Sequence, residues 1–76
     1  MVSKQQWLID IENTKKEIVA YDLLLKGYEI LAALPENIES GATMSYKALG
    51  QEHFRHKEDC VEFLEKLERL NIGDEE

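Results

Sequence analysis

Apolar residues recur at alternating steps of four and three along two long stretches of this 76-residue chain. This spacing places the side chains in a stripe along one side of an α-helix, and it differs from the strict alternation of a β-strand. We therefore expect an all-α fold with two main helices. The first stripe consists of Trp7, Ile11, Thr14, Ile18, Tyr21, Leu25, Tyr28 and Ala32. The second consists of Tyr46, Leu49, His53, His56, Cys60, Phe63, Leu67 and Leu70.

The boundaries of the first helix follow from residues that start and stop helices. Ser3 is a good N-cap, and Gln6, three residues later, occupies the second position of a capping box. Pro35 ends the helix, because its ring clashes with the preceding turn and its nitrogen donates no hydrogen bond. These signals predict a helix over residues 4–34.

The second helix is predicted over residues 45–71, with Ser45 as its N-cap and Gly73 just beyond its end. Residues 35–45 form the connection between the two helices. We expect the proline at the start of this connection to begin a short helical turn, which Gly41 then breaks.

Two helices joined in this way are predicted to fold back as an antiparallel hairpin, a single domain that spans residues 1–76. With the turn centred near residue 40, His53 is expected opposite Gly27. The missing side chain of the glycine then leaves room for the imidazole ring. Such a long hairpin has a core only one layer thick.

The first helix is more apolar than one partner helix requires. Between residues 18 and 34 the only polar or glycine positions besides the tyrosines are Asp22, Lys26, Gly27 and Glu29. A helix that is apolar nearly all round must be covered on more than one side. An 8.8 kDa chain with one cysteine also has a small core and no disulfide, and oligomerisation is the usual remedy. We therefore predict a four-helix dimer whose interface contains Ile18, Tyr21, Leu24, Leu25, Tyr28 and Leu31.

The second helix carries a stripe of side chains that bind metals in other proteins. His53, His56 and Cys60 lie at i, i+3 and i+7, and imidazole and thiolate are zinc ligands. The alternative interpretation is a polar layer between the helices, in which Tyr21 and Tyr28 hydrogen-bond the histidines. The spacing matches no zinc finger, and no second cluster completes a tetrahedron. The sequence therefore favours the polar layer, with no metal and no cofactor.

No motif in the chain predicts catalysis. Cys60 next to a histidine is the minimal arrangement for a thiol nucleophile, but a buried core cysteine is the favoured interpretation. The sequence contains no glycine-rich phosphate loop, no metalloprotease HExxH and no Walker pattern. We expect a protein that is not an enzyme.

The formal net charge is −7, and the acidic surplus lies in the second half of the chain. From residue 52 to the end there are nine acidic and four basic residues. The acidic residues that lie off the stripe, and so form an outer face, are Glu58, Asp59, Glu62 and Glu65. This face is either a solvated surface that keeps a small protein in solution or a docking surface for a protein with a basic surface.

Trp7 lies at the open end of the predicted hairpin, next to Leu8 and Ile9. Large aromatic residues at the edge of a domain are common interface anchors. The alternative is that Trp7 seals the end of the bundle against Leu70 and Ile72 of the same chain.

Charge and hydropathy exclude several classes of protein. The acidic balance excludes a globally basic nucleic-acid binder. No apolar run approaches the roughly 18 residues of a membrane-spanning helix, and a single cysteine fits the reducing cytoplasm.

The expected function is that of a cytoplasmic, non-catalytic protein-interaction module: a regulator, adaptor or inhibitor that acts as a homo-oligomer. One alternative is a metal- or small-ligand-binding helical protein that uses His53, His56 and Cys60. Another is an acidic nucleic-acid mimic that blocks a basic nucleic-acid-binding protein. In composition alone the chain is similar to small acidic inhibitors and adaptors of phages and mobile elements, and no motif assigns it to a family.

Overall fold

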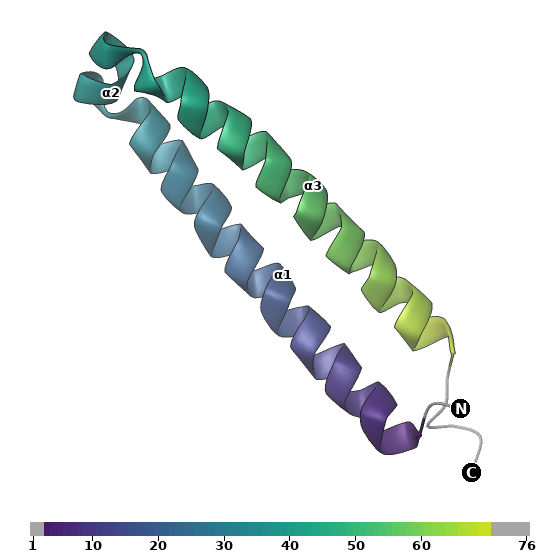
Figure 1. Ribbon diagram of the computed structural model, residues 1–76. Helices are drawn as coiled ribbons and strands as arrows, with labels where there is room; N and C mark the ends of the chain where they lie inside the picture. The colour runs from purple at the N-terminus through teal and green to yellow at the C-terminus, as the bar shows by residue number, and fades with distance from the viewer. Residues whose placement is uncertain (1–2, 71–76) are drawn as a thin grey trace.

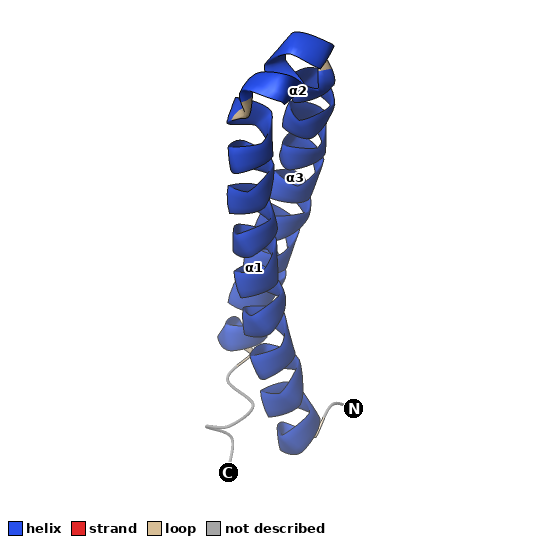
Figure 2. Cartoon of the chain, turned by 90° about the vertical axis from the view of Figure 1, so that its left-hand side faces the viewer, coloured by secondary structure: helices blue, strands red, loops and turns tan. Residues whose placement is uncertain are grey.

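The computed structural model describes residues 3–70, which form three helices: α1 (Lys4–Ala33), α2 (Pro35–Ser40) and α3 (Ala42–Arg69). The two long helices run antiparallel side by side, and α2 closes one end of the rod (Figure 1). Figure 2 shows them crossing at a shallow angle. The molecule measures 60 × 14 × 14 Å. The predicted all-α antiparallel hairpin is confirmed.

The start and end of α1 follow the predicted signals. The Ser3 hydroxyl accepts a hydrogen bond from the Gln6 backbone N–H at 3.1 Å, which satisfies one of the free donors of the first turn. At the other end Leu34 is extended, and Pro35 is the first residue of α2. The proline occupies the helix position that needs no backbone donor.

The turn into α3 differs from the prediction, because α3 begins at Ala42 and Ser45 lies inside the helix. Gly41 has a φ of +83°, a left-handed conformation that reverses the chain at one residue. Side chains then tie the connection to the end of α1. The Thr43 hydroxyl donates to the Ala32 carbonyl, and the Asn37 amide donates to the Leu31 carbonyl, both at 2.7 Å.

The two long helices pair within a few residues of the predicted register, in which residue i of the first helix faces about residue 80 − i of the second. Trp7 reaches Leu67, and Tyr28 lies against Tyr46 and His53. The predicted contact between His53 and Gly27 is wrong even so, because a Cβ added at Gly27 meets nothing within 4 Å. Gly50 is the glycine that faces the other helix.

The stripe of α3 that faces α1 is also rotated from the predicted one. Tyr46, His53, Cys60 and Leu67 lie toward α1 as expected. Between them, three half-buried residues occupy the positions next to the ones predicted: Gly50, Lys57 and Leu64. The predicted members left exposed are Leu49, His56, Phe63 and Leu70. Both sets of positions, the predicted row of Leu49, His56 and Phe63 and the observed row of Gly50, Lys57 and Leu64, repeat every seven residues. The spacing alone therefore does not show which of the two rows faces α1.

The seam between the helices buries little. Within residues 3–70 only Ile11, Thr14 and Leu67 are buried, with 9%, 5% and 8% of their surface exposed. The buried hydroxyl of Thr14 has a hydrogen-bond partner in its own helix, because it donates to the Asp10 carbonyl at 2.7 Å. No helix in this part of the chain is long and apolar enough to cross a bilayer. The predicted stop signal at Gly73 and the predicted contact of Ile72 lie outside the described residues.

Two glycine substitutions test the turn. Gly41→Ala is expected to lower the free energy of unfolding by about 1–2 kcal/mol, because alanine is strained in the left-handed region. Gly50→Ala is the control, since the added Cβ lies 3.9 Å from the Tyr28 Cβ, an ordinary contact. It is expected to raise stability by about 0.8–1 kcal/mol through helix propensity. Urea unfolding measures both, and the same sign for both would contradict this account of the turn.

Candidate functional site

The middle of the hairpin contains a cluster of aromatic and histidine rings. The His53 ring lies 5.2 Å from the ring of Tyr28 and 6.0 Å from that of Tyr21, measured between centroids. His53 is half-buried, and its Nδ1 donates to the Leu49 carbonyl at 2.8 Å. The His53 ring is edge-on to Tyr21 and tilted against Tyr28, so ring contacts stand where the predicted polar layer has tyrosine–histidine hydrogen bonds.

His56 and Cys60 lie differently from His53. The His56 ring is exposed and stacks on Tyr21 at a centroid distance of 6.2 Å. The Cys60 thiol points to Glu17 on α1, with 3.5 Å between Sγ and Oε2. Within residues 3–70 no group of three or more His, Cys, Asp or Glu side chains is arranged to hold a metal ion. A metal site at these residues therefore stays a prediction without geometric support.

The environment of Cys60 keeps its sulfur in the thiol form. Burial against α1 raises the pKa of Cys60, the hydrogen bond to Glu17 raises it further, and the charges of Glu17 and Asp59 act in the same direction. A reactive cysteine needs the opposite surroundings, because the thiolate is the nucleophile and neighbouring cations favour it.

Trp7 joins the two long helices at the open end of the hairpin. Its indole N–H donates to the Leu67 carbonyl at 2.6 Å, and the ring is half-buried. Leu67 lies in the last turn of α3, and its carbonyl also accepts a hydrogen bond from the Leu70 backbone N–H at 3.2 Å. This contact agrees with the sealing interpretation of Trp7, although the residue reached is Leu67 rather than Leu70. A role in partner binding stays a prediction.

The predicted acidic face lies on the outer side of α3. Glu58, Asp59, Glu62 and Glu65 are all exposed. Together with Arg55 and Val61 they surround a shallow hollow of about 420 Å³. The four carboxylates are therefore open to solvent, and a role of this face in docking stays a prediction.

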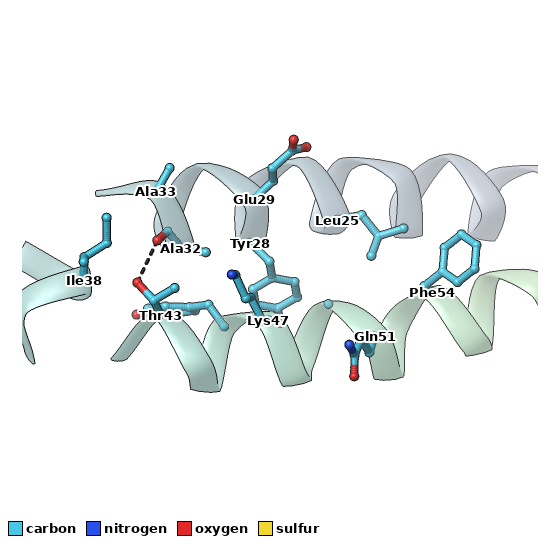
Figure 3. A pocket seen from close by; sticks show the side chains of 12 residues that line it. Leu25, Tyr28, Glu29, Ala32, Ala33, Ile38, Thr43, Lys47, Gln51 and Phe54 are labelled. Atoms are coloured by element: carbon cyan, nitrogen blue, oxygen red, sulfur yellow. Dashed lines mark hydrogen bonds between the residues drawn. The ribbon is translucent and has the colours of Figure 1, made fainter. Parts of the chain in front are cut away.

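A larger groove, which the sequence reasoning missed, lies near the closed end of the hairpin (Figure 3). Its volume is about 820 Å³. It forms because Ala32 and Gly50 leave space between the helices, while Ile38 of α2 and Phe54 of α3 border it. The signal in the sequence was the small residues at those two positions. The lining residues are Leu25, Tyr28, Glu29, Ala32, Ala33, Ile38, Thr43, Tyr46, Lys47, Gly50, Gln51 and Phe54.

The residues predicted to form a dimer interface fall into two groups. Four of them lie along the seam or the groove and are half-buried within the hairpin: Ile18, Tyr21, Leu25 and Tyr28. Leu24 and Leu31 lie beside the seam, and Leu24 is exposed. Many other large apolar side chains also remain exposed: Leu8, Ile9, Val19, Leu23, Ile30, Ile38, Met44, Leu49, Phe54, Phe63 and Leu70.

Comparisons with protein-family models, with curated proteins and with solved structures find no match to this chain. The hairpin itself presents four features to other molecules or to a second copy: a thin seam, an acidic outer face, a groove and an excess of exposed apolar side chains.

The thiol of Cys60 provides a test of the contact with Glu17. Its alkylation by iodoacetamide at pH 8 is expected to be slow, because a raised pKa leaves little thiolate. Glu17→Gln removes the negative charge beside the sulfur, lowers the pKa of Cys60 and is expected to speed the reaction. Glu58→Gln, an exposed carboxylate outside that contact, is the control. Equal rates for Glu17→Gln and the unmodified protein across pH 7–10 would contradict the observed contact.

Proposed function

We propose that this protein is a small, acidic, non-catalytic interaction module that acts as a homodimer and regulates a partner with a basic surface. The observation that carries the proposal is the apolar surface that the hairpin leaves uncovered. Soluble monomers rarely expose apolar patches of more than a few hundred Å² unless the patch binds something.

The total surface supports association. The accessible surface of the chain is 5882 Å², whereas a compact monomer of 8.8 kDa exposes about 4,800 Å². The excess of about 1,100 Å² exceeds the roughly 800 Å² that each partner buries in a standard interface. Two layers of helices stacked on each other form a four-helix bundle, in which each helix is covered on two sides. This arrangement meets the requirement that the apolar α1 imposes.

The acidic face supports the second half of the proposal. Its carboxylates lie on the outer side of α3, away from α1, so a dimer formed on a flat side of the hairpin leaves them in solvent. A net charge of −7 attracts basic surfaces at long range and increases association rates. The module is therefore suited to block or recruit a protein whose own surface is positively charged.

The dimer is tested by mass in solution. Sedimentation equilibrium is expected to give twice the 8.8 kDa of the chain, and the melting temperature is expected to rise with protein concentration, because folding and association are coupled. A mass of one chain at all concentrations up to about 1 mM, with a constant melting temperature, would refute the homodimer.

The acidic face is tested with charge-neutral variants of the same size. The triple substitution Glu58→Gln, Glu62→Gln and Glu65→Gln is expected to weaken binding to a partner isolated from the native host by about tenfold or more at low salt, mainly through a slower association rate. The control removes three charges elsewhere: Glu12→Gln, Glu29→Gln and Glu36→Gln.

Surface plasmon resonance between 50 and 300 mM NaCl measures both variants. Salt is expected to weaken binding of the unmodified protein and to affect the first variant less. Equal affinities for the two triple variants would contradict a docking role for this face. Capture of a nucleic-acid-binding protein would favour the mimic among the possible inhibitors.

A further inference from the structure

The hairpin has two flat sides, and we infer that the second copy of the chain covers one particular side, which we call the leucine face. This inference rests on the proposed homodimer and names the surface that forms it. The leucine face consists of two rows, one on each long helix, beside the seam. Its members are Leu24, Leu31, Leu49, His56, Phe63 and Leu70.

Contacts between the helices place the two rows on the same side. Glu17, seven residues before Leu24, meets Cys60 from this side of α1. His56, which belongs to the row on α3, stacks on Tyr21 of α1. Residues seven apart return to the same side of a helix, so each contact locates its whole row. The rows on α1 and α3 therefore flank the seam together.

The opposite side, which we call the groove face, carries more charge beside the middle of the seam. The row that flanks the seam on α1 contains Lys15, Asp22 and Glu29, at the same seven-residue spacing. Asp22 forms an ion pair with Lys57 at 2.7 Å, and Glu29 and Lys47 line the groove. Covering this side with a second copy would remove several charges from water, which costs free energy unless each is paired. The two sides therefore differ in what they can bury.

Charge also favours a second copy on the leucine face. Each copy carries a net charge of −7, so two copies repel unless carboxylates stay away from the contact. None of the six members of the leucine face is acidic, and the acidic residues of the same α1 row, Asp10 and Glu17, lie nearer the open end than Leu24. Both helices contribute apolar side chains to this face. Two copies of the face can therefore pack against each other, as a two-fold symmetric interface requires.

The assignment leaves the other surfaces free. A dimer through the leucine face covers Leu24 and Phe63 and leaves Phe54, at the edge of the groove, uncovered. The acidic outer side of α3 remains in solvent as well. Self-association and partner binding thus use different sides of the same hairpin.

The chain offers matched pairs of residues for the test. On α3, Phe63 belongs to the leucine face and Phe54 to the groove face, with exposed fractions of 52% and 49%. They are nine residues apart, which places them on opposite sides of the helix. On α1, Leu24 of the leucine face matches Val19, which lies five residues away and is also exposed.

The experiment compares Leu24→Glu and Phe63→Glu with Val19→Glu and Phe54→Glu in sedimentation equilibrium. The first pair is expected to raise the dimer dissociation constant by roughly 30-fold or more, as loss of a central interface residue does. The second pair is expected to change it by less than about threefold. Circular dichroism at high concentration reports whether each variant remains helical.

A measurement on the unmodified protein covers the case in which the first pair fails to fold. Hydroxyl-radical footprinting is expected to show that Leu24, Leu49 and Phe63 become protected as concentration rises through the dissociation constant, while Val19 and Phe54 do not. Equal protection of the two sets of residues, or dissociation by Val19→Glu or Phe54→Glu, would overturn the inference without contradicting the dimer itself. A monomeric unmodified protein would overturn the proposed function itself.

Discussion

A two-helix hairpin has a single contact between its long elements, and this contact limits everything else in the molecule. Each helix offers only one stripe to the other, so the remaining sides stay in solvent. Here Ile11, Thr14 and Leu67 are the buried residues of the described chain, all near the open end, where Trp7 closes the helices together. The rest of the seam is half-buried. The hairpin is therefore an incomplete unit, and its exposed apolar sides are a direct consequence of its architecture.

The centre of the seam contains rings rather than aliphatic side chains. The His53 ring contacts both Tyr21 and Tyr28 there, and its imidazole donates a hydrogen bond within its own helix. These aromatic rings fill the space between the two helices next to Gly50, which has no side chain of its own. Flat rings with defined contacts restrict how far one helix can slide along the other, in the way that polar positions in coiled coils fix register.

Much of the fold could be predicted from the sequence, because caps and breakers act locally. Ser3, Pro35 and Gly41 have the expected effects on the ends of α1 and α2. The start of α3 could not be predicted from Ser45, since a glycine in the left-handed conformation made that cap unnecessary. The facing row of α3 was ambiguous because Leu49 and Gly50 both fit the repeat. The groove depends on small residues of two helices meeting, which only the tertiary register determines.

The ambiguity of the repeat carries physical information. A helix in which the row beside the contact is as apolar as the contact itself has two seams, one for each neighbour. In α3 the row of Leu49 and Phe63 was as good a candidate for the intrachain seam as the row of Gly50 and Leu64. Only one of these rows can face α1. The row of Leu49 and Phe63 does not face α1. It is apolar all the same, and nothing within the described part of the hairpin covers it. A sequence pattern that fits two phases is therefore what a hairpin needs if it is to become half of a four-helix bundle.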